Sequence, residues 1–105
     1  MSVLTVTKDN FEKEVLKSEV PVLLDFWAAW CSPCRMLAPT IHEIANDIPE
    51  TEAKIGQINV DEEQELAQAF NIVSIPTLVV MKSGKVLNNV AGVRPKDFIL
   101  KMLKS

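Results

Sequence analysis

Residues 20–35 read VPVLLDFWAAWCSPCR, an apolar run that leads directly into the only two cysteines of the chain. The segment Val20–Trp27 is nearly all apolar, which is typical of a central strand buried on both faces. From about Ser32 the apolar positions recur at helical spacing, so we expect a helix to begin there. Cys31 and Cys34 therefore fall at the junction of a buried strand and a helix.

The spacing of Cys31 and Cys34 indicates chemistry rather than a structural crosslink. A disulfide stabilises more when it closes a longer loop, so a ring this short adds little. At a helix start, free backbone N–H groups and the helix dipole favour the thiolate, the reactive form of cysteine. Pro33 stiffens the turn and Cys34 lies one turn later on the same side. We expect Cys31 to be the exposed attacking thiol and Cys34 the resolving thiol.

Two other interpretations of the pair are a buried pair without a role and half of a metal site. A zinc site needs two further ligands. His42 is the only histidine and lies two turns along the predicted helix, too far to join the cysteines. The acidic residues within Asp61–Glu65 are expected to cap and solvate a helix start instead. The pattern favours redox chemistry, with no metal bound.

The remaining elements follow from hydrophobic periodicity and turn residues. Asp9 is expected to cap the first helix, with Glu12 three residues on, and Pro39 to kink the second. The turn at Ser83-Gly84 predicts an antiparallel hairpin. The sequence thus predicts an α/β fold, a mixed sheet with helices on both faces. The expected elements are strand Val3–Val6, helix Asp9–Leu16, strand Val20–Trp27, helix Ser32–Ile48, strand Lys54–Val60, helix Glu62–Phe70, strands Thr77–Met81 and Lys85–Val90, and a last helix from Pro95.

Composition points to one ordinary globular domain. The chain has 105 residues, 48% of them hydrophobic and 24% charged, and a net charge of −3. This mild charge gives no reason to expect nucleic acid or a membrane as partner. Residues 1–9 lack the features of a signal peptide, and the longest apolar stretch is far shorter than the roughly 20 residues that span a bilayer. We expect a cytoplasmic protein, where cysteine pairs are transiently oxidised and catalytic.

Further motifs accompany the cysteine pair in a fixed order. They are Asp25-Phe26-Trp27-Ala28, Trp30-Cys31-Ser32-Pro33-Cys34, Met36-Leu37-Ala38-Pro39, Asn59-Val60-Asp61, Ser74-Ile75-Pro76-Thr77 and Gly92. Together these motifs resemble the thioredoxin family over the whole chain. The resemblance implies the thioredoxin fold, a central mixed five-stranded sheet flanked by four helices, as a single domain over residues 1–105.

The resemblance also assigns roles around the cysteines. It implies that Asp25 lies buried behind them and relays a proton through water to or from Cys34; the other interpretation is a strand-edge carboxylate facing solvent. Pro76 would be cis and pack against the disulfide, with the Ile75 backbone pairing with an extended segment of the substrate. Gly92 would permit close approach of a substrate backbone, or would only be a flexible loop residue.

An apolar rim around Cys31 is a further implication of the resemblance, with Trp27 filling structure beneath it. Docking on this rim would exclude water from the exchange and allow many proteins to bind weakly. The expected rim consists of Trp30, Pro33, Ile75, Gly92 and Val93.

Three positions depart from the usual family pattern. Ser32 replaces a glycine between the cysteines, and we expect a modest shift of the reduction potential, of either sign. Gln57 replaces a lysine near Asp25, so the pKa of Asp25 should be higher than with lysine there. Ser74 replaces a frequent glycine beside the substrate groove and is expected to alter the choice of partner.

The predicted function is that of a protein-disulfide reductase, which reduces target proteins through Cys31 and Cys34 and contributes to cell redox homeostasis. No cofactor is expected in the chain itself. The resemblance implies electrons from NADPH through a thioredoxin reductase, diverse disulfide-containing targets and a monomeric state. The alternatives are a disulfide-forming oxidant or isomerase of the same fold, and a binding module in which redox chemistry is incidental.

Overall fold

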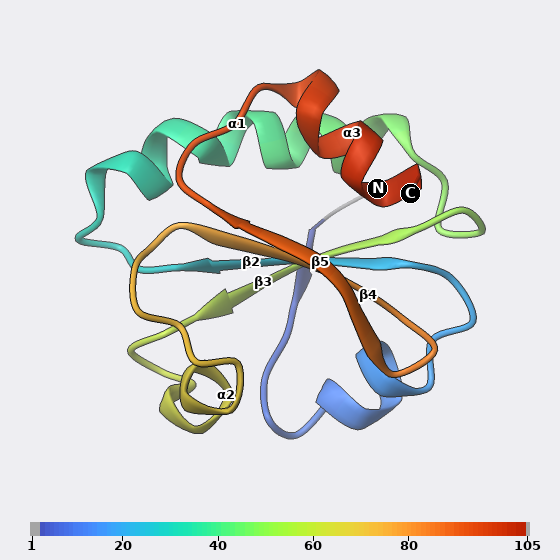
Figure 1. Ribbon diagram of the computed structural model, residues 1–105, viewed down its shortest axis with the longest axis horizontal. Coiled ribbons are helices and arrows are strands. Elements are labelled where there is room, and N and C mark those ends of the chain that lie inside the picture. The colour runs from blue at the N-terminus through green and yellow to red at the C-terminus, as the bar shows by residue number, and fades with distance from the viewer. Residues whose placement is uncertain (1–2, 105) are drawn as a thin grey trace.

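The computed structural model describes residues 3–104, which form three layers with a five-stranded sheet in the middle (Figure 1). Helices α1 and α3 cover one face, and α2 and the π-helical segment η1 cover the other (Figure 1). No helix within these residues is long and apolar enough to cross a membrane. The elements are β1 (Leu4–Thr5), η1 (Glu12–Leu16), β2 (Val22–Trp27), α1 (Ser32–Asp47), β3 (Lys54–Asn59), α2 (Gln64–Ala69), β4 (Thr77–Lys82), β5 (Lys85–Ala91) and α3 (Lys96–Lys104).

The sheet has the strand order β1-β3-β2-β4-β5 and is mixed, as the sequence predicts. β1 and β2 run parallel to β3, whereas β4 runs antiparallel to both β2 and β5. The hairpin turn contains Ser83 at φ 54° and Gly84 at φ 77°. Two successive positive φ values are the geometry that matches the twist of paired strands. In the strand order given above, β2 is the central strand, and its C-terminal end leads into α1.

Two cores lie on opposite faces of the sheet because successive side chains of a strand point to opposite sides. On β2, Leu23 packs with the buried face of α1, including Leu37 and Ile41. Leu24 and Phe26 point the other way, into the core under η1 and α2. α1 is continuous across Pro39. The burial of β2 on both faces explains why its sequence is nearly all apolar.

The first helix differs from the prediction. It is a π-helical segment whose N-terminal flanking residue is Phe11, and no side chain caps it, so the expected cap at Asp9 is wrong. Asn10 orders the turn instead: its side chain accepts from the Thr7 N–H at 2.8 Å and donates to the Thr5 carbonyl at 2.9 Å. Leu16, expected on the apolar side, is exposed.

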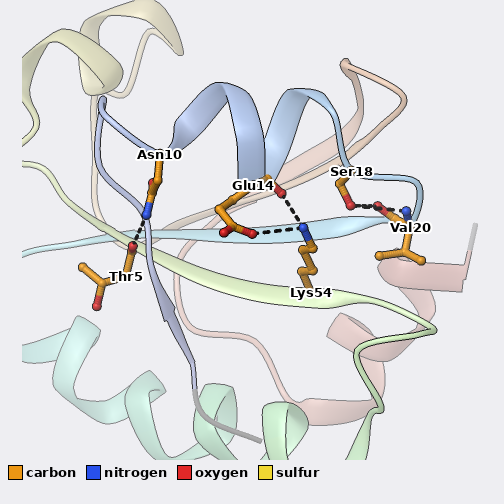
Figure 2. Close-up of polar contacts among 6 residues, drawn as sticks. All are labelled: Thr5, Asn10, Glu14, Ser18, Val20 and Lys54. Carbon is orange, nitrogen blue, oxygen red and sulfur yellow. Dashed lines mark hydrogen bonds and ion pairs between the residues drawn. The ribbon is translucent and has the colours of Figure 1, made fainter.

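A lysine from β3 contacts this segment. Lys54 Nζ donates to the carbonyl oxygen and to the carboxylate of Glu14, both at 3.1 Å (Figure 2). In an α-helix that carbonyl would accept from the Ser18 N–H, which here reaches Val15 O at 3.3 Å. The Lys17 N–H reaches Glu12 O at 2.9 Å, five residues back, which is the π-helical pattern. The Ser18 hydroxyl closes the segment by donating to Val20 O at 2.8 Å (Figure 2).

Candidate active site

The two cysteines lie at the N-terminus of α1 and form a disulfide, with 5.3 Å between their Cα atoms. Cys31 is the N-cap residue, with φ −89° and ψ 111°, and the Cys34 N–H donates to Cys31 Sγ at 3.2 Å. A sulfur in this position satisfies one of the free N–H groups of the helix start. When the pair is reduced, the same N–H and the helix dipole stabilise negative charge on Cys31.

The exposure of the two sulfur-bearing residues differs from the prediction. Cys31 was expected to be exposed, yet it is 4% exposed and Cys34 is 3% exposed. Both are held by a small cluster that includes Ala28 and the half-buried Trp27. Access distinguishes the two cysteines instead: among residues 3–104, Cys31 lines an open groove of about 400 Å³ that Cys34 does not line. This Cys31 groove is lined by Trp30, Cys31, Val60, Ala67, Ile72, Val73, Ser74 and Ile75.

The Cys31 groove overlaps only in part with the rim expected from the sequence. Trp30 and Ile75 line it, whereas the exposed Pro33 and Val93 and the half-buried Gly92 do not. Its other walls come from the end of β3, from α2 and from the loop that follows α2. The sequence interpretation missed these walls, although the apolar pair directly before Ser74 was a usable signal. The missed residues are Val60, Ala67, Ile72 and Val73.

Trp30 is fixed by an acidic residue from another part of the chain. The indole is 67% exposed, and its Nε1 donates to Asp61 Oδ2 at 2.8 Å. Asp61 therefore does not cap α2, whose N-terminal flanking residue Glu63 also makes no side-chain cap. Glu63 accepts from the Lys8 N–H at 2.9 Å. Asp61 and Glu63 thus contact neighbouring segments and do not cap α2, whereas Glu65 lies exposed in the first turn of α2, in agreement with the solvating role.

The segment around Pro76 lies beside the disulfide. The Ile75–Pro76 peptide bond is cis, as the resemblance implied. The carbonyl oxygen of Ile75 is 3.8 Å from Cys31 Sγ, and the Pro76 carbonyl accepts from the Gly92 N–H at 2.8 Å. Gly92 has φ 94°, a conformation that favours glycine, and a side chain there would meet nothing within 4 Å. The requirement for glycine is thus a matter of backbone conformation.

Asp25 is buried, 1% exposed, as the resemblance implied, and not at a solvent-facing edge. It lies two residues after Leu23 on β2, so it points to the side of the sheet covered by α1, where Cys34 is also buried. Burial raises the pKa of Asp25 from 3.8 to about 6, against the opposing effect of the hydrogen bond from Gln57. Gln57 Nε2 donates to Asp25 Oδ2 at 3.2 Å, while Oδ1 has no partner within residues 3–104.

Two other residues considered from the sequence are exposed. Ser32 lies between the cysteines, and His42 lies further along α1. No group of three or more potential ligands that could hold a metal ion occurs among the described residues. A cysteine pair that closes a disulfide at the start of a helix, beside a groove and directly after a central strand, defines a thiol–disulfide oxidoreductase.

Comparison with known proteins agrees with this class. The family profile described as Thioredoxin matches residues 2–105. A thioredoxin of Rickettsia bellii is 44% identical over 100 residues, covering 95% of this chain and 94% of that protein. Thioredoxin 2 of Chlorobaculum tepidum is 47% identical over 97 residues, covering 92% and 88%. The crystal structure of Malassezia sympodialis thioredoxin superposes with a TM-score of 0.85 at 31% identity, covering 98% and 90%.

The chain belongs to the thioredoxin family. It has the thioredoxin fold, and it is a disulfide oxidoreductase of the thioredoxin type.

Proposed function

We propose that this protein acts as a general reductant of protein disulfides, with Cys31 as nucleophile and Cys34 as resolving thiol. The observation that carries the assignment is the hydrogen bond that the Cys34 N–H donates to Cys31 Sγ at 3.2 Å. It favours the thiolate on Cys31, the cysteine that lines the groove. Among the described residues, Cys34 Sγ accepts no such N–H and Cys34 does not line the groove, which supports its role as the resolving thiol of the second step.

In the first step, the Cys31 thiolate attacks one sulfur of a target disulfide. A Cys31–target disulfide forms, the target disulfide breaks, and the other target sulfur leaves as a thiolate that takes a proton. In the second step, Cys34 loses its proton and attacks Cys31 Sγ. The mixed disulfide breaks, the second target thiol is released, and the Cys31–Cys34 disulfide remains. Two electrons and two protons have then passed to the target.

Asp25 supplies the base for the second step in this proposal. Its pKa of about 6 leaves the carboxylate mostly ionised at neutral pH and able to accept the proton of Cys34. The burial of both residues on the α1 side of the sheet supports this role. In the reverse reaction, Asp25 returns the proton to Cys34.

The target would bind as an extended segment over the Cys31 groove. We propose that Trp30 and Ile75 supply apolar contact, that the Ile75 backbone pairs with the target chain next to the cis Pro76, and that Gly92 permits close approach of the target backbone. The exposed Ser32 and Pro33 would lie at the margin of this contact. The mostly apolar lining of the groove is suited to weak binding of many targets.

The reduced state is restored, in this proposal, by a thioredoxin reductase that draws electrons from NADPH, with no cofactor held by the chain itself. We further propose a cytoplasmic protein that works as one thioredoxin domain over residues 1–105 and as a monomer. A reducing cytoplasm would keep the pair available for repeated cycles.

A trapping experiment tests the assignment of roles. Cys34→Ser leaves the mixed disulfide unresolved, so a disulfide-linked target peptide should accumulate on Cys31, as measured by mass spectrometry. Cys31→Ser is the matched control and should trap nothing at neutral pH. Equal trapping by both variants would refute the assignment, and binding unchanged in a double Cys→Ser variant would favour the binding module.

The reduction potential tests the direction of the reaction. Equilibration against a glutathione or dithiothreitol buffer should give a value near the roughly −270 mV of thioredoxins. A potential between about −120 and −180 mV, the range of disulfide-forming oxidants and isomerases, would contradict the reductase assignment.

A further inference from the structure

A second groove lies next to the Cys31 groove and has no part in the mechanism above. It has a volume of about 350 Å³ and is lined by residues 70–74, Thr77, Val79, Val86, Asn89 and Ala91. We call it the β4–β5 groove. None of its lining residues is charged. The lining combines apolar side chains with neutral hydrogen-bonding groups, which suits an uncharged peptide better than an ionic ligand.

The floor of the β4–β5 groove is a strip of sheet that the helices leave open. Val79 of β4 belongs to the core under η1 and α2, and its partner across the hairpin is Asn89. Cross-strand partners project from the same face of a sheet, so Asn89 lies on this face too. Val86, at the far end of the groove from Cys31, stays 48% exposed. The η1–α2 layer therefore ends before β5, and an uncharged floor that includes Val86 and Asn89 remains accessible.

The two grooves adjoin each other. Ile72, Val73 and Ser74 line both of them, so this segment forms the wall between the β4–β5 groove and the Cys31 groove. Val73 is 96% exposed, so its side chain stands free on top of that wall. A chain that leaves the Cys31 groove over Val73 enters the β4–β5 groove directly.

We propose that the β4–β5 groove is a second binding subsite, which holds an uncharged, extended flank of the target polypeptide at a distance from its reactive cysteine. The proposal rests on the proposed function, because the Cys31 groove must bind the same target. Because residues 72–74 separate the two grooves and line both, one extended polypeptide that crosses Val73 can span both of them. The subsite would favour targets with apolar residues in that flank and disfavour charged flanks, which would lose water without gaining a partner.

The test uses two peptides that share a disulfide. The long peptide carries about eight uncharged, extended residues on each side of the cysteine, about 26 Å at 3.3 Å per residue, and the short peptide lacks both flanks. Val86→Glu places a charge in the β4–β5 groove. Leu87→Glu is the matched control, because Leu87 is the next residue of β5, has similar exposure (46%) and does not line the groove. KM and kcat are measured for reduction of both peptides.

Val86→Glu should raise KM about fivefold for the long peptide, which is about the effect of losing one buried methylene group, with kcat unchanged. KM for the short peptide, and both KM values of Leu87→Glu, should match the wild type. Equal KM increases for both peptides, or none for either, would overturn the subsite. If the glutamate variant fails to fold, the isosteric Val86→Thr gives the same comparison with a smaller effect.

Two outcomes separate this proposal from its alternatives. If the wild type reduces neither peptide, the proposed reductase function is refuted, and the subsite that depends on it is refuted as well. If sedimentation shows a dimer that Val86→Glu dissociates, while the KM values stay equal, a second copy of the chain occupies the groove and the peptide subsite is refuted.

Discussion

Replacing Asp25 by asparagine should stabilise the protein at neutral pH. The pKa of Asp25 is raised from 3.8 to about 6 in the folded chain, chiefly by burial. Between these two values the folded state binds more protons than the unfolded state, so the free energy of unfolding falls as the pH rises. At about 1.4 kcal/mol per pKa unit, the ionised carboxylate costs about 3 kcal/mol above pH 6. The cost vanishes below the unfolded pKa, where Asp25 is protonated in both states.

Urea unfolding of the oxidised protein between pH 3.5 and 8 measures this effect. The unfolding free energy of Asp25→Asn minus that of the wild type should increase by about 3 kcal/mol as the pH rises from 3.5 to above 6, because the wild type loses stability over this range. Above that pH the difference should stay constant. Asp9→Asn is the control, because Asp9 is exposed and the same substitution there removes no buried charge. A difference that does not change with pH, or that shrinks as pH rises, would refute the argument.

Three further predictions concern single side chains. Gln57→Lys should lower the pKa of Asp25 below its value of about 6, since a positive charge favours the carboxylate; NMR titration giving equal values in both proteins would reject this. Lys96→Met removes contacts from α3 to two α1 carboxylates, including Asp47 at 2.6 Å. It should lower the Tm by less than about 5 °C at low salt, because the contacts are exposed ion pairs. Calorimetry in 1 M NaCl should show that most of this difference is lost, since salt screens the charges. A difference that persists in 1 M NaCl would show that packing rather than charge holds α3 in place. Ser32→Gly should shift the reduction potential by up to about 30 mV, measured against glutathione, and an unchanged potential would show that the exposed hydroxyl has no effect on the sulfurs.

The local sequence predicted the elements well where one dominant force acts on them. β2 is apolar throughout because both its faces are covered, and α1 shows helical spacing because one side packs on the sheet. The segment η1 was predicted less well. Its apolar pattern indicated an ordinary helix, whereas the Lys17 N–H bonds to Glu12 O, five residues back, and Lys54, distant in sequence, donates to the Glu14 carbonyl. Such a contact exists only once the sheet has formed.

The candidate site shows the same division. Cys31, Asp25 and the Ile75–Pro76 bond were found from the sequence and its family resemblance, because short motifs carry them. Most of the Cys31 groove was missed, since its walls come from β3, α2 and the following loop, which only the strand order brings together. Burial of Cys31 was also missed. Exposure depends on how those segments close over the sulfur, which no motif encodes.

The position of Lys96 has a consequence for how the protein can change. α1 is 16 residues long, about 24 Å, and carries the cysteines at one end and the partners of Lys96, Glu43 and Asp47, near the other. Substitutions at the C-terminal end of α1, where Lys96 binds, can therefore change the stability of the folded protein without changing the reactivity of the cysteines. In a lineage that adapts to higher temperature or higher salt, substitutions at the C-terminal end of α1 could change the stability of the protein while the reactivity of the cysteines is kept.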